Sequence, residues 1–494
     1  MRAGLCLSLA LLTYAASRPR GAAAGAQAGG AQVVAFVGVS VVPLDRERVL
    51  ADHTVVVRDG RITEVGPAGK TKIPDGATRI DGRGKYLTPG LADMHAHLFP
   101  GDGAANDLAA QQLLLYLANG VTTVRNMIGA PAHLVLRERV ATGKLPGPRL
   151  YTAGPPVQGK DAVSPEVGER IVYAQKQAGY DLVKVHEGLK PDVYQALADA
   201  SRKAGIPLAG HVTASVGLRR ALAARQSSVE HLDGYLQALA PEGSAAPPSQ
   251  VVLGPALGQL DEHRLPELAR ATREAGVYNT PTLALFRIVV SSDAPAEFLK
   301  WPELRYVPAK MREGFAKQKG GIKAGEAPEA ERLRYLELRN RAVKALHEAG
   351  AKLLVGPDSP QLFLVPGFAT HREMAAMAEA GLSPYAVLEA ATRNAAEHLG
   401  ASAEFGTIEV GKRADLVLLD ANPLQAVANA SRIAGVMARV GEPDALTQRV
   451  RGAAQPRPVV AHAQHERRAF QPPPHVYAAV NRVRRDAVLD GVLD

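Results

Sequence analysis

Two histidines stand one residue apart at the end of an apolar run, in the stretch Leu87-Thr88-Pro89-Gly90-Leu91-Ala92-Asp93-Met94-His95-Ala96-His97. In a β-strand, residues i and i+2 project from the same face, so His95 and His97 can bind one metal ion together. Such a pair alone is weak evidence, because surface strands also carry two histidines by chance. A metal site therefore needs further ligands elsewhere in the chain.

Four further short apolar segments carry a metal-capable residue at or near their C-terminal end. These segments are residues 181–184, 207–211, 228–231 and 353–358, and the residues concerned are Lys184, His211, His231 and Asp358. Taken singly, a lysine at a strand end is usually solvated and a core histidine is usually hydrogen-bonded. The evidence for a metal site lies in the joint pattern of six residues.

Amphipathic helical patterns alternate with these apolar segments. They cover residues 107–119, 167–178, 191–204, 218–224, 265–275 and 332–349, and several end in Ala-Gly or Asn-Gly, a common helix C-terminal signal. Candidate strands at residues 121–125, 149–153 and 277–283 bring the expected number to eight. Alternating strands and helices predict an α/β fold, here a (β/α)8 TIM-like barrel, whose functional residues lie at the C-terminal ends of the strands.

The chain resembles the amidohydrolase superfamily, on the binuclear metal-dependent branch that includes prolidase-like and imidazolonepropionase-like enzymes. Besides the His-x-His strand, the matching stretches are Gly120-Val121-Thr122-Thr123-Val124-Arg125, Gly210-His211-Val212, Glu230-His231, Gly356-Pro357-Asp358 and the segment from Gly406 to Leu416. Together they run from about Val34 to Gly441. The pattern identifies a superfamily rather than a substrate.

The resemblance implies two divalent metal ions, for which zinc is the expected element. His95, His97 and Asp358 would bind the more buried ion, and His211 and His231 the more exposed one. Lys184 would bridge both ions as N6-carboxylysine, because a neutral amine can capture carbon dioxide as an anionic carbamate, whereas the ordinary lysine pKa of about 10.4 keeps the amine protonated. A metal-bridging hydroxide would attack the substrate, with Asp358 as the general base and acid.

Substrate contacts are less defined by the sequence. Tyr235 follows His231 by four residues and could donate to a developing oxyanion, although packing is the more usual role of a tyrosine there. His186 lies two residues beyond Lys184 and could share its inward face, or it could be a solvated loop histidine. Arg125 and His371 could each bind an anionic substrate group or a backbone carbonyl.

The expected reaction is hydrolysis of an amide or peptide C–N bond in a small molecule, such as a prolidase-like dipeptide or an N-acyl amino acid. The alternatives are a mononuclear deaminase or cyclic amide or amidine hydrolase, which generally lacks the bridging lysine, and a catalytically inactive scaffold, which would have lost ligands. The net charge is +9, but the chain shows no compact basic stripe with interleaved aromatics, so a nucleic-acid partner is not expected. Assembly into a homo-oligomer is compatible with the sequence.

The flanks of the predicted barrel complete the domain organisation. Residues 88–403 are the expected barrel, and residues 31–87 plus 404–445 a composite β-sandwich, in which Asp59-Gly60 indicates a hairpin. Residues 1–30 resemble a secretory signal peptide and contain the single cysteine, Cys6. We therefore expect a periplasmic or secreted protein without stable membrane insertion after processing. Residues 446–494 form a basic C-terminal extension that departs from the superfamily pattern.

Overall fold

The computed structural model describes residues 33–100, 108–241 and 250–438. The predicted signal peptide, residues 1–30, and the C-terminal extension, residues 446–494, lie outside these described residues. Within the described part, no helix is both long and apolar enough to cross a lipid bilayer.

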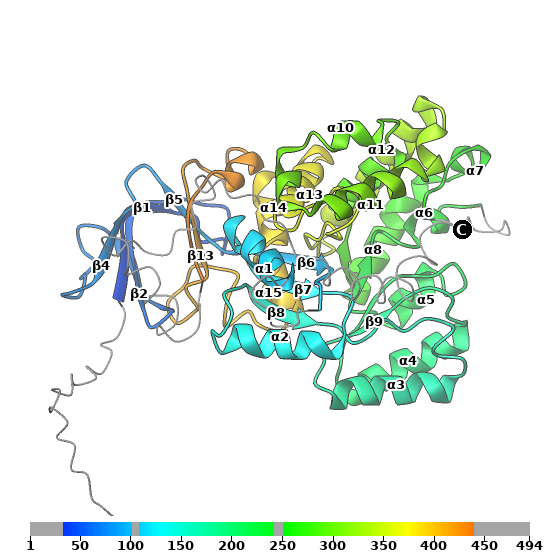
Figure 1. Cartoon of the computed structure of the whole chain (residues 1–494), viewed down its shortest axis with the longest axis horizontal. Helices are drawn as coiled ribbons and strands as arrows, with labels where there is room; N and C mark the ends of the chain where they lie inside the picture. Colours follow the sequence, from blue (N-terminus) through cyan, green and yellow to red (C-terminus); the bar gives the residue numbers. More distant parts are fainter. Residues whose placement is uncertain (1–32, 101–107, 242–249, 439–494) are drawn as a thin grey trace, which may run out of the picture.

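Both flanks of the chain pair in one seven-stranded sheet, in the order β14-β13-β5-β1-β2-β3, with β4 paired to β1. Its strands are β1 (Val33–Val41), β2 (Leu50–Arg58), β3 (Arg61–Pro67), β4 (Thr78–Asp81), β5 (Tyr86–Pro89), β13 (Leu416–Leu419) and β14 (Ile433–Met437). Figure 1 shows these strands gathered at one end of the molecule.

The junction between the two flanks is the antiparallel pairing of β5 with β13, in which Leu87 lies opposite Leu418. Alternate residues of these strands, such as Leu87 and Leu416, face one apolar cluster. The cluster also contains Val41 of β1 and Val55 of β2. Because this cluster draws on both ends of the described chain, each flank covers apolar surface that the other would otherwise expose. The strand β5 leads directly into β6 and so fixes the sheet against the rest of the fold.

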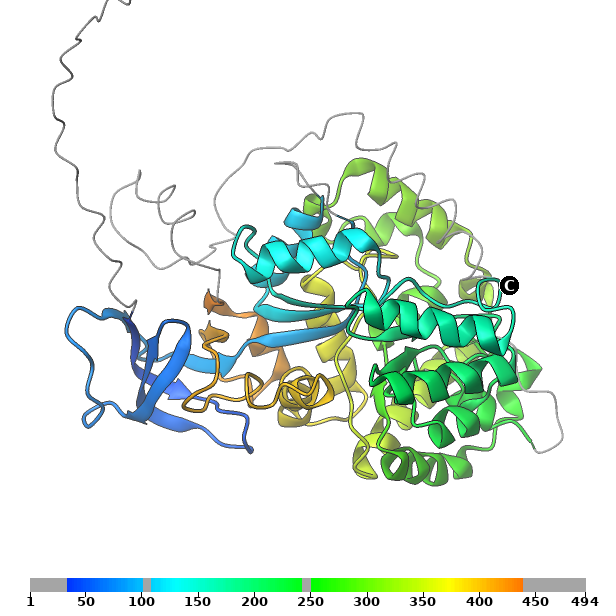
Figure 2. The ribbon, with the colours of Figure 1, turned by 90° about the horizontal axis from the view of Figure 1, so that it is seen from below.

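The remaining strands form two parallel sheets, β6-β7-β8 and β9-β10-β11-β12. They are β6 (Leu91–Ala96), β7 (Val121–Asn126), β8 (Arg149–Thr152), β9 (Val183–Val185), β10 (Leu208–Gly210), β11 (Ser228–Glu230) and β12 (Tyr278–Thr280). Isolated parallel bridges connect the two sheets, between Ala153 and Leu182 and between Val157 and Val185. The fold is thus mixed α/β, with helices around parallel strands, as Figure 2 shows.

The eighth expected strand, residues 353–358, is not a regular strand. It is an extended segment with parallel bridges from Leu353 to Asn279 and from Ser359 to Ala96, beside β12 and β6 respectively. Pro357 has no N–H to donate, which accounts for the interrupted ladder. The predicted strand at residues 277–283 is also shorter, because Thr282 has a left-handed backbone (φ 54°) and a helix begins at Leu283.

The helices lie mainly between successive parallel strands, and a long helical insertion separates β12 from residue 353. They are α1 (Leu108–Ala118), α2 (Pro131–Ala141), α3 (Pro165–Gln177), α4 (Pro191–Ala204), α5 (Leu218–Ala223), α6 (Tyr235–Ala238), α7 (Pro255–Gly258), α8 (Leu265–Ala275), α9 (Leu283–Val290), α10 (Pro295–Phe298), α11 (Ala309–Gly320), α12 (Glu329–Glu348), α13 (Phe368–Glu379), α14 (Pro384–Ala390) and α15 (Arg393–His398). The helices α4 and α8 have the predicted bounds. In α4, Pro191 takes the first helical position and Gly205 ends the helix in the left-handed conformation.

Candidate metal centre

The six predicted ligands all lie at or just beyond the C-terminal ends of strands or in the extended segment 353–358. His95 belongs to β6, and His97 follows it. Lys184 lies in β9, whereas His211 and His231 directly follow β10 and β11. Because parallel strands point their C-terminal ends to the same side, side chains far apart in the sequence meet there.

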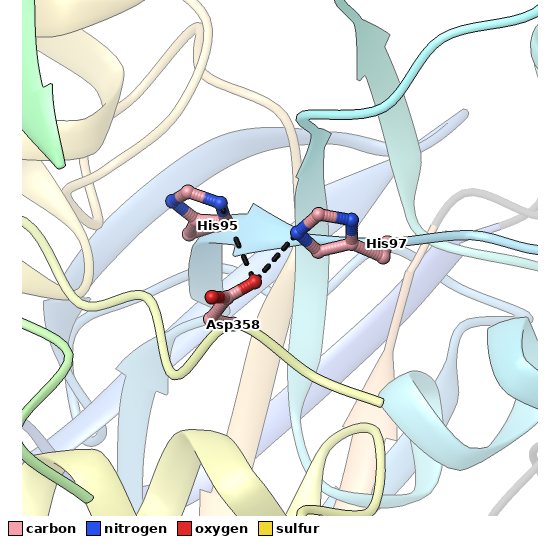
Figure 3. Close-up of side chains that lie close together, drawn as sticks. All are labelled: His95, His97 and Asp358. Atoms are coloured by element: carbon pink, nitrogen blue, oxygen red, sulfur yellow. Dashed lines mark ion pairs between the residues drawn. The ribbon is translucent and has the colours of Figure 1, made fainter. Parts of the chain in front are cut away.

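His95, His97 and Asp358 form a compact group whose ligand atoms all lie within 4.8 Å of one another. Figure 3 shows both imidazoles turned toward the carboxylate. The Nε2 atom of His97 lies 2.5 Å from Oδ1 of Asp358, and Nε2 of His95 lies 3.5 Å from the same oxygen. His95 is completely buried, whereas the His97 side chain is 23% exposed, so the group is reached from the side of His97.

The other three predicted ligands adjoin this group. The Nζ atom of Lys184 lies 3.2 Å from Nε2 of His95. Nε2 of His231 lies 3.8 Å from Oδ2 of Asp358, and the His231 ring is 4.5 Å from the ring of His95. The ring of His211 lies 4.9 Å from the ring of His231. The structure therefore brings all six residues into one continuous cluster.

Two of the ligands occupy an unusual backbone conformation. His231 has φ 61° and Asp358 has φ 63°, both in the left-handed region that non-glycine residues rarely adopt. Such conformations cost about 1–3 kcal/mol each and concentrate at functional sites. Consecutive residues of a regular strand face opposite sides. At His231 the left-handed backbone departs from this alternation, and Glu230 and His231 both contact His95.

Three of the imidazoles are oriented by a contact at Nδ1. This atom lies 2.8 Å from Glu230 Oε2 in His95, 2.8 Å from Asp233 Oδ2 in His211 and 3.0 Å from Thr282 Oγ1 in His231. When Nδ1 donates its proton to such a partner, Nε2 keeps a lone pair for a metal ion. This arrangement is the usual environment of a metal-binding histidine.

Burial favours the neutral, ligand-competent forms of the nitrogen groups. It lowers the pKa of His95 to about 4 and the pKa of His211 to about 3. Burial also lowers the pKa of the Lys184 amine. For Asp358 burial would raise the pKa, but His95 and His97 hold it well below its ordinary value. The cluster thus combines neutral nitrogen donors with an anionic oxygen donor.

The donor set fits divalent metal ions of the zinc type, which prefer imidazole nitrogen and carboxylate oxygen. His97 Nε2 and Asp358 Oδ1 are buried and form a close ion pair, and Nε2 of His95 lies 3.5 Å from the same oxygen. Two imidazole nitrogens and one carboxylate oxygen thus converge on one point, which is a donor set that a divalent ion of this type can use.

The two predicted substrate contacts have different surroundings. His186 lies beside the cluster, with its ring 4.5 Å from the ring of His211, and its buried Nδ1 has no hydrogen-bond partner among the described residues. Tyr235 is 1% exposed, and its hydroxyl is hydrogen-bonded to Thr272 of α8 at 2.8 Å. This placement favours the packing role of Tyr235, whereas His186 stays a substrate-contact prediction.

The two residues left open by the sequence both bind backbone carbonyls. His371 Nε2 contacts the carbonyl oxygen of Asn119 at 2.9 Å. Arg125 donates from Nε to the carbonyl oxygen of Met94 and from Nη2 to Glu230 Oε1. Arg125 is fully buried, so it has no access to an anionic group in solvent.

Sequence reasoning missed the hydrogen-bond partners of three predicted ligand histidines, namely Glu230, Asp233 and Thr282. For Glu230 the signal was present in the Glu230-His231 pair, but an alternating strand would have pointed the glutamate away from the histidine. Asp233 and Thr282 lie in loops after β11 and β12, where periodicity gives no orientation. Only the folded backbone brings these side chains to the imidazoles.

Comparison with known proteins gives one family match and several individual relatives. The model described as the amidohydrolase family matches residues 86–440. The imidazolonepropionase of Sphingopyxis alaskensis is 26% identical over 428 residues, which cover 75% of this chain and 86% of that protein. The imidazolonepropionase of Stenotrophomonas maltophilia is 42% identical over 71 residues, which cover 14% of this chain and only 17% of that protein.

Two solved structures at the same level of identity have the same fold. A protein assigned as a prolidase from Bifidobacterium longum is 26% identical, with a TM-score of 0.61 and coverage of 83% of this chain and 96% of that one. A bottromycin amidohydrolase is also 26% identical, with a TM-score of 0.61 and coverage of 82% and 86%. These likenesses extend over most of both chains.

Proposed function

The chain belongs to the amidohydrolase family, and from this premise we propose that it is a binuclear metal-dependent hydrolase that cleaves an amide or peptide C–N bond. The membership confirms the resemblance that the sequence motifs predict. The observation that carries the binuclear proposal is the position of Lys184 Nζ, 3.2 Å from His95 Nε2 within the ligand cluster. Mononuclear relatives generally lack a lysine at this point, so its presence favours the binuclear alternative.

We propose further that the two parallel sheets belong to one (β/α)8 barrel. The bridges from Ala153 to Leu182, from Asn279 to Leu353 and from Ser359 to Ala96 support this closure, because they connect the end of each sheet to the start of the other. The seven-stranded sheet of both flanks would then be the accompanying small β domain.

In the proposed centre, His95, His97 and Asp358 would bind one ion, and His211 and His231 the other. Lys184 would bridge the ions as a carboxylated lysine. Its environment suits this modification, because burial lowers the pKa of the Lys184 amine and so favours the neutral form that captures carbon dioxide. Zinc is the element that the nitrogen and oxygen donors favour.

The chain's own residues would move the proton. Bound metal ions would supply hydroxide at neutral pH by lowering the pKa of water. Asp358, anionic because its pKa is held low, would accept the proton released on attack at the carbonyl carbon and donate it to the leaving nitrogen. His186, whose buried Nδ1 has no hydrogen-bond partner in the described part of the chain, would bind a polar group of the substrate.

The substrate class that we favour is a prolidase-like dipeptide or an N-acyl amino acid, supported by the structural likeness to the protein assigned as a prolidase. The imidazolonepropionase relative favours a second candidate, a cyclic amide or amidine hydrolase. The two candidate enzyme classes differ in the number of metal ions that catalysis requires, because cyclic amide or amidine hydrolases generally lack the bridging lysine.

A substrate screen tests the proposal. Zinc-loaded protein is assayed against X-Pro dipeptides, N-acyl amino acids and cyclic amides, in parallel with Asp358→Asn and the control Asp420→Asn, which alters an exposed aspartate paired with Lys85. We expect hydrolysis by the wild type and by Asp420→Asn, and a kcat about 10²–10⁴-fold lower for Asp358→Asn. Equal activity of Asp358→Asn would disprove the role of Asp358, and no hydrolysis of any class would disprove the proposed function.

A further inference from the structure

A buried ion pair lies directly behind His95, on the side opposite the ligand cluster. Glu230 Oε1 accepts a hydrogen bond from Arg125 Nη2 at 2.8 Å, and both side chains are completely buried. Glu230 Oε2 lies 2.8 Å from Nδ1 of His95, whose other nitrogen faces Asp358 and Lys184. The pair therefore contacts a predicted metal ligand without itself reaching the cluster.

The contact with Glu230 determines what His95 can do. A carboxylate can only accept, so Nδ1 of His95 must carry the proton and Nε2 must carry the lone pair. It is this tautomer that binds a metal ion through Nε2, and the carboxylate also makes the imidazole a stronger donor. A rotated or protonated ring would offer no lone pair to the ion.

Arg125 in turn determines where Glu230 points. Its Nε donates to the carbonyl oxygen of Met94, the residue before His95, and its Nη1 donates to Ser228 Oγ and contacts His398 Nε2. The guanidinium is thus fixed to β6, β11 and α15 at once. Ser228 Oγ also donates to Glu230 Oε1, so each Glu230 oxygen has a partner.

A buried pair of this kind is not explained by stability alone. Replacing a buried ion pair by neutral residues is often neutral or stabilising, because both charges must leave water. Two of the bonds that this pair makes instead reach His95: Glu230 Oε2 contacts Nδ1 of the ring, and Arg125 Nε donates to the carbonyl oxygen of the preceding residue, Met94. The fixed geometry, rather than the attraction of the two charges, is what the site requires.

We infer that Arg125 and Glu230 are positioning residues that hold His95 in its metal-binding tautomer and orientation. The inference rests on the proposed metal-dependent function and extends it to two residues that bind neither metal nor substrate. Arg125 acts through Glu230, so removing both should cost no more metal affinity than removing the Glu230 charge alone.

The experiment measures the zinc affinity of metal-free protein by competition with a chelator. The variants are Glu230→Gln, the double variant Arg125→Met with Glu230→Gln, and Asp415→Asn as a control that alters another buried pair, Arg413–Asp415, just before β13. We expect zinc affinity to fall about 10–100-fold in Glu230→Gln and equally in the double variant, and to be unchanged in Asp415→Asn. Saturating zinc should restore most of the activity to Glu230→Gln.

The outcomes separate the inference from the proposed function. Wild-type affinity in a folded Glu230→Gln overturns the positioning role and leaves the proposed function standing. Should Glu230→Gln not fold, the double variant, which leaves no unpaired buried charge, decides in the same way. Zinc binding that is absent from the wild type itself overturns both.

Discussion

At the scale of single residues, the hydroxyl of Tyr235 is the clearest case in which position determines role. It is hydrogen-bonded to Thr272 inside the packing between α6 and α8. We predict that Tyr235→Phe changes kcat/KM less than about threefold and lowers the free energy of unfolding by about 1 kcal/mol, the net worth of one hydrogen bond. Steady-state kinetics and urea denaturation measure both effects. A loss of kcat of a hundredfold without a loss of stability would show that the phenol reaches the substrate.

The same scale shows how far the residues of the site can be predicted from the sequence. All six candidate ligands could be named, because a strand end followed by a histidine, lysine or aspartate is visible in the sequence. Glu230 could not be placed together with His231, because consecutive strand residues face opposite sides, whereas both contact His95 here and His231 has a left-handed backbone, φ 61°, that no residue pattern predicts. For Tyr235 the sequence left both a substrate contact and a packing role open, since spacing alone does not tell a loop tyrosine from a packed one.

At the scale of elements, the extended segment 353–358 approaches β6 so closely that Gly356 has no room for a side chain. A Cβ atom at this position would lie 2.7 Å from the backbone nitrogen of His95 and 2.5 Å from Cγ2 of Thr280. We predict that Gly356→Ala costs roughly 1–3 kcal/mol of unfolding free energy, as overpacking usually does. It should also weaken zinc binding, because the clash displaces His95 from Asp358.

The matched control for this prediction is Gly258→Ala in α7, where a Cβ atom would meet nothing within 4 Å. In a helix, alanine is favoured over glycine by up to about 1 kcal/mol, so Gly258→Ala should not destabilise the protein. Thermal denaturation and zinc titration of both variants test the contrast. If Gly356→Ala bound zinc as tightly as the wild type, the close approach would not position the site.

Element types were largely predictable, and their irregularities were not. The alternation of short apolar runs with amphipathic helices places β6 to β12 and bounds α4 and α8. The insertion from α9 to α11 and the interrupted segment at Pro357 depend on tertiary contacts, such as the hydrogen bonds that the backbone N–H groups of Leu283 and Ala284 at the start of α9 donate to Glu373. Such long-range contacts leave no local periodicity.

At the scale of the whole molecule, buried ionisable groups predict how stability depends on pH in the metal-free protein. Among the described residues, burial lowers the pKa of seven imidazoles, His95, His133, His186, His211, His231, His371 and His398. In the unfolded chain these imidazoles take up a proton near pH 6.5, whereas the pKa of His95 in the folded protein is about 4. Between these values the unfolded state binds more protons, so the free energy of unfolding falls as the pH falls.

Among the described residues, four carboxyl groups whose pKa is raised by desolvation oppose this trend, because the folded state binds their protons first: Asp93, Glu187, Asp233 and Glu373. Since seven imidazoles outnumber four carboxyls, we predict a net loss of stability from pH 6.5 to pH 4. Chemical denaturation at several pH values in the presence of a chelator measures it. Stability that stays constant or rises on acidification would contradict the prediction.

The pairing of the two flanks also acts at the scale of the whole molecule. The strands β5 and β13 are more than three hundred residues apart in the sequence, and β5 directly precedes β6, the strand that carries His95. This pairing follows from apolar faces that neither flank could bury alone. It ties the start of β6 to the last strands of the described chain.

The most direct measurement for the whole account is a zinc titration of the metal-free protein, followed by calorimetry or metal analysis, with the wild type and Lys184→Met compared. We predict about two equivalents of zinc for the wild type. Lys184→Met, which lacks the bridging group, should bind at least one of them far more weakly. One equivalent or none in the wild type, or two equally tight equivalents in Lys184→Met, would contradict a binuclear centre bridged by Lys184.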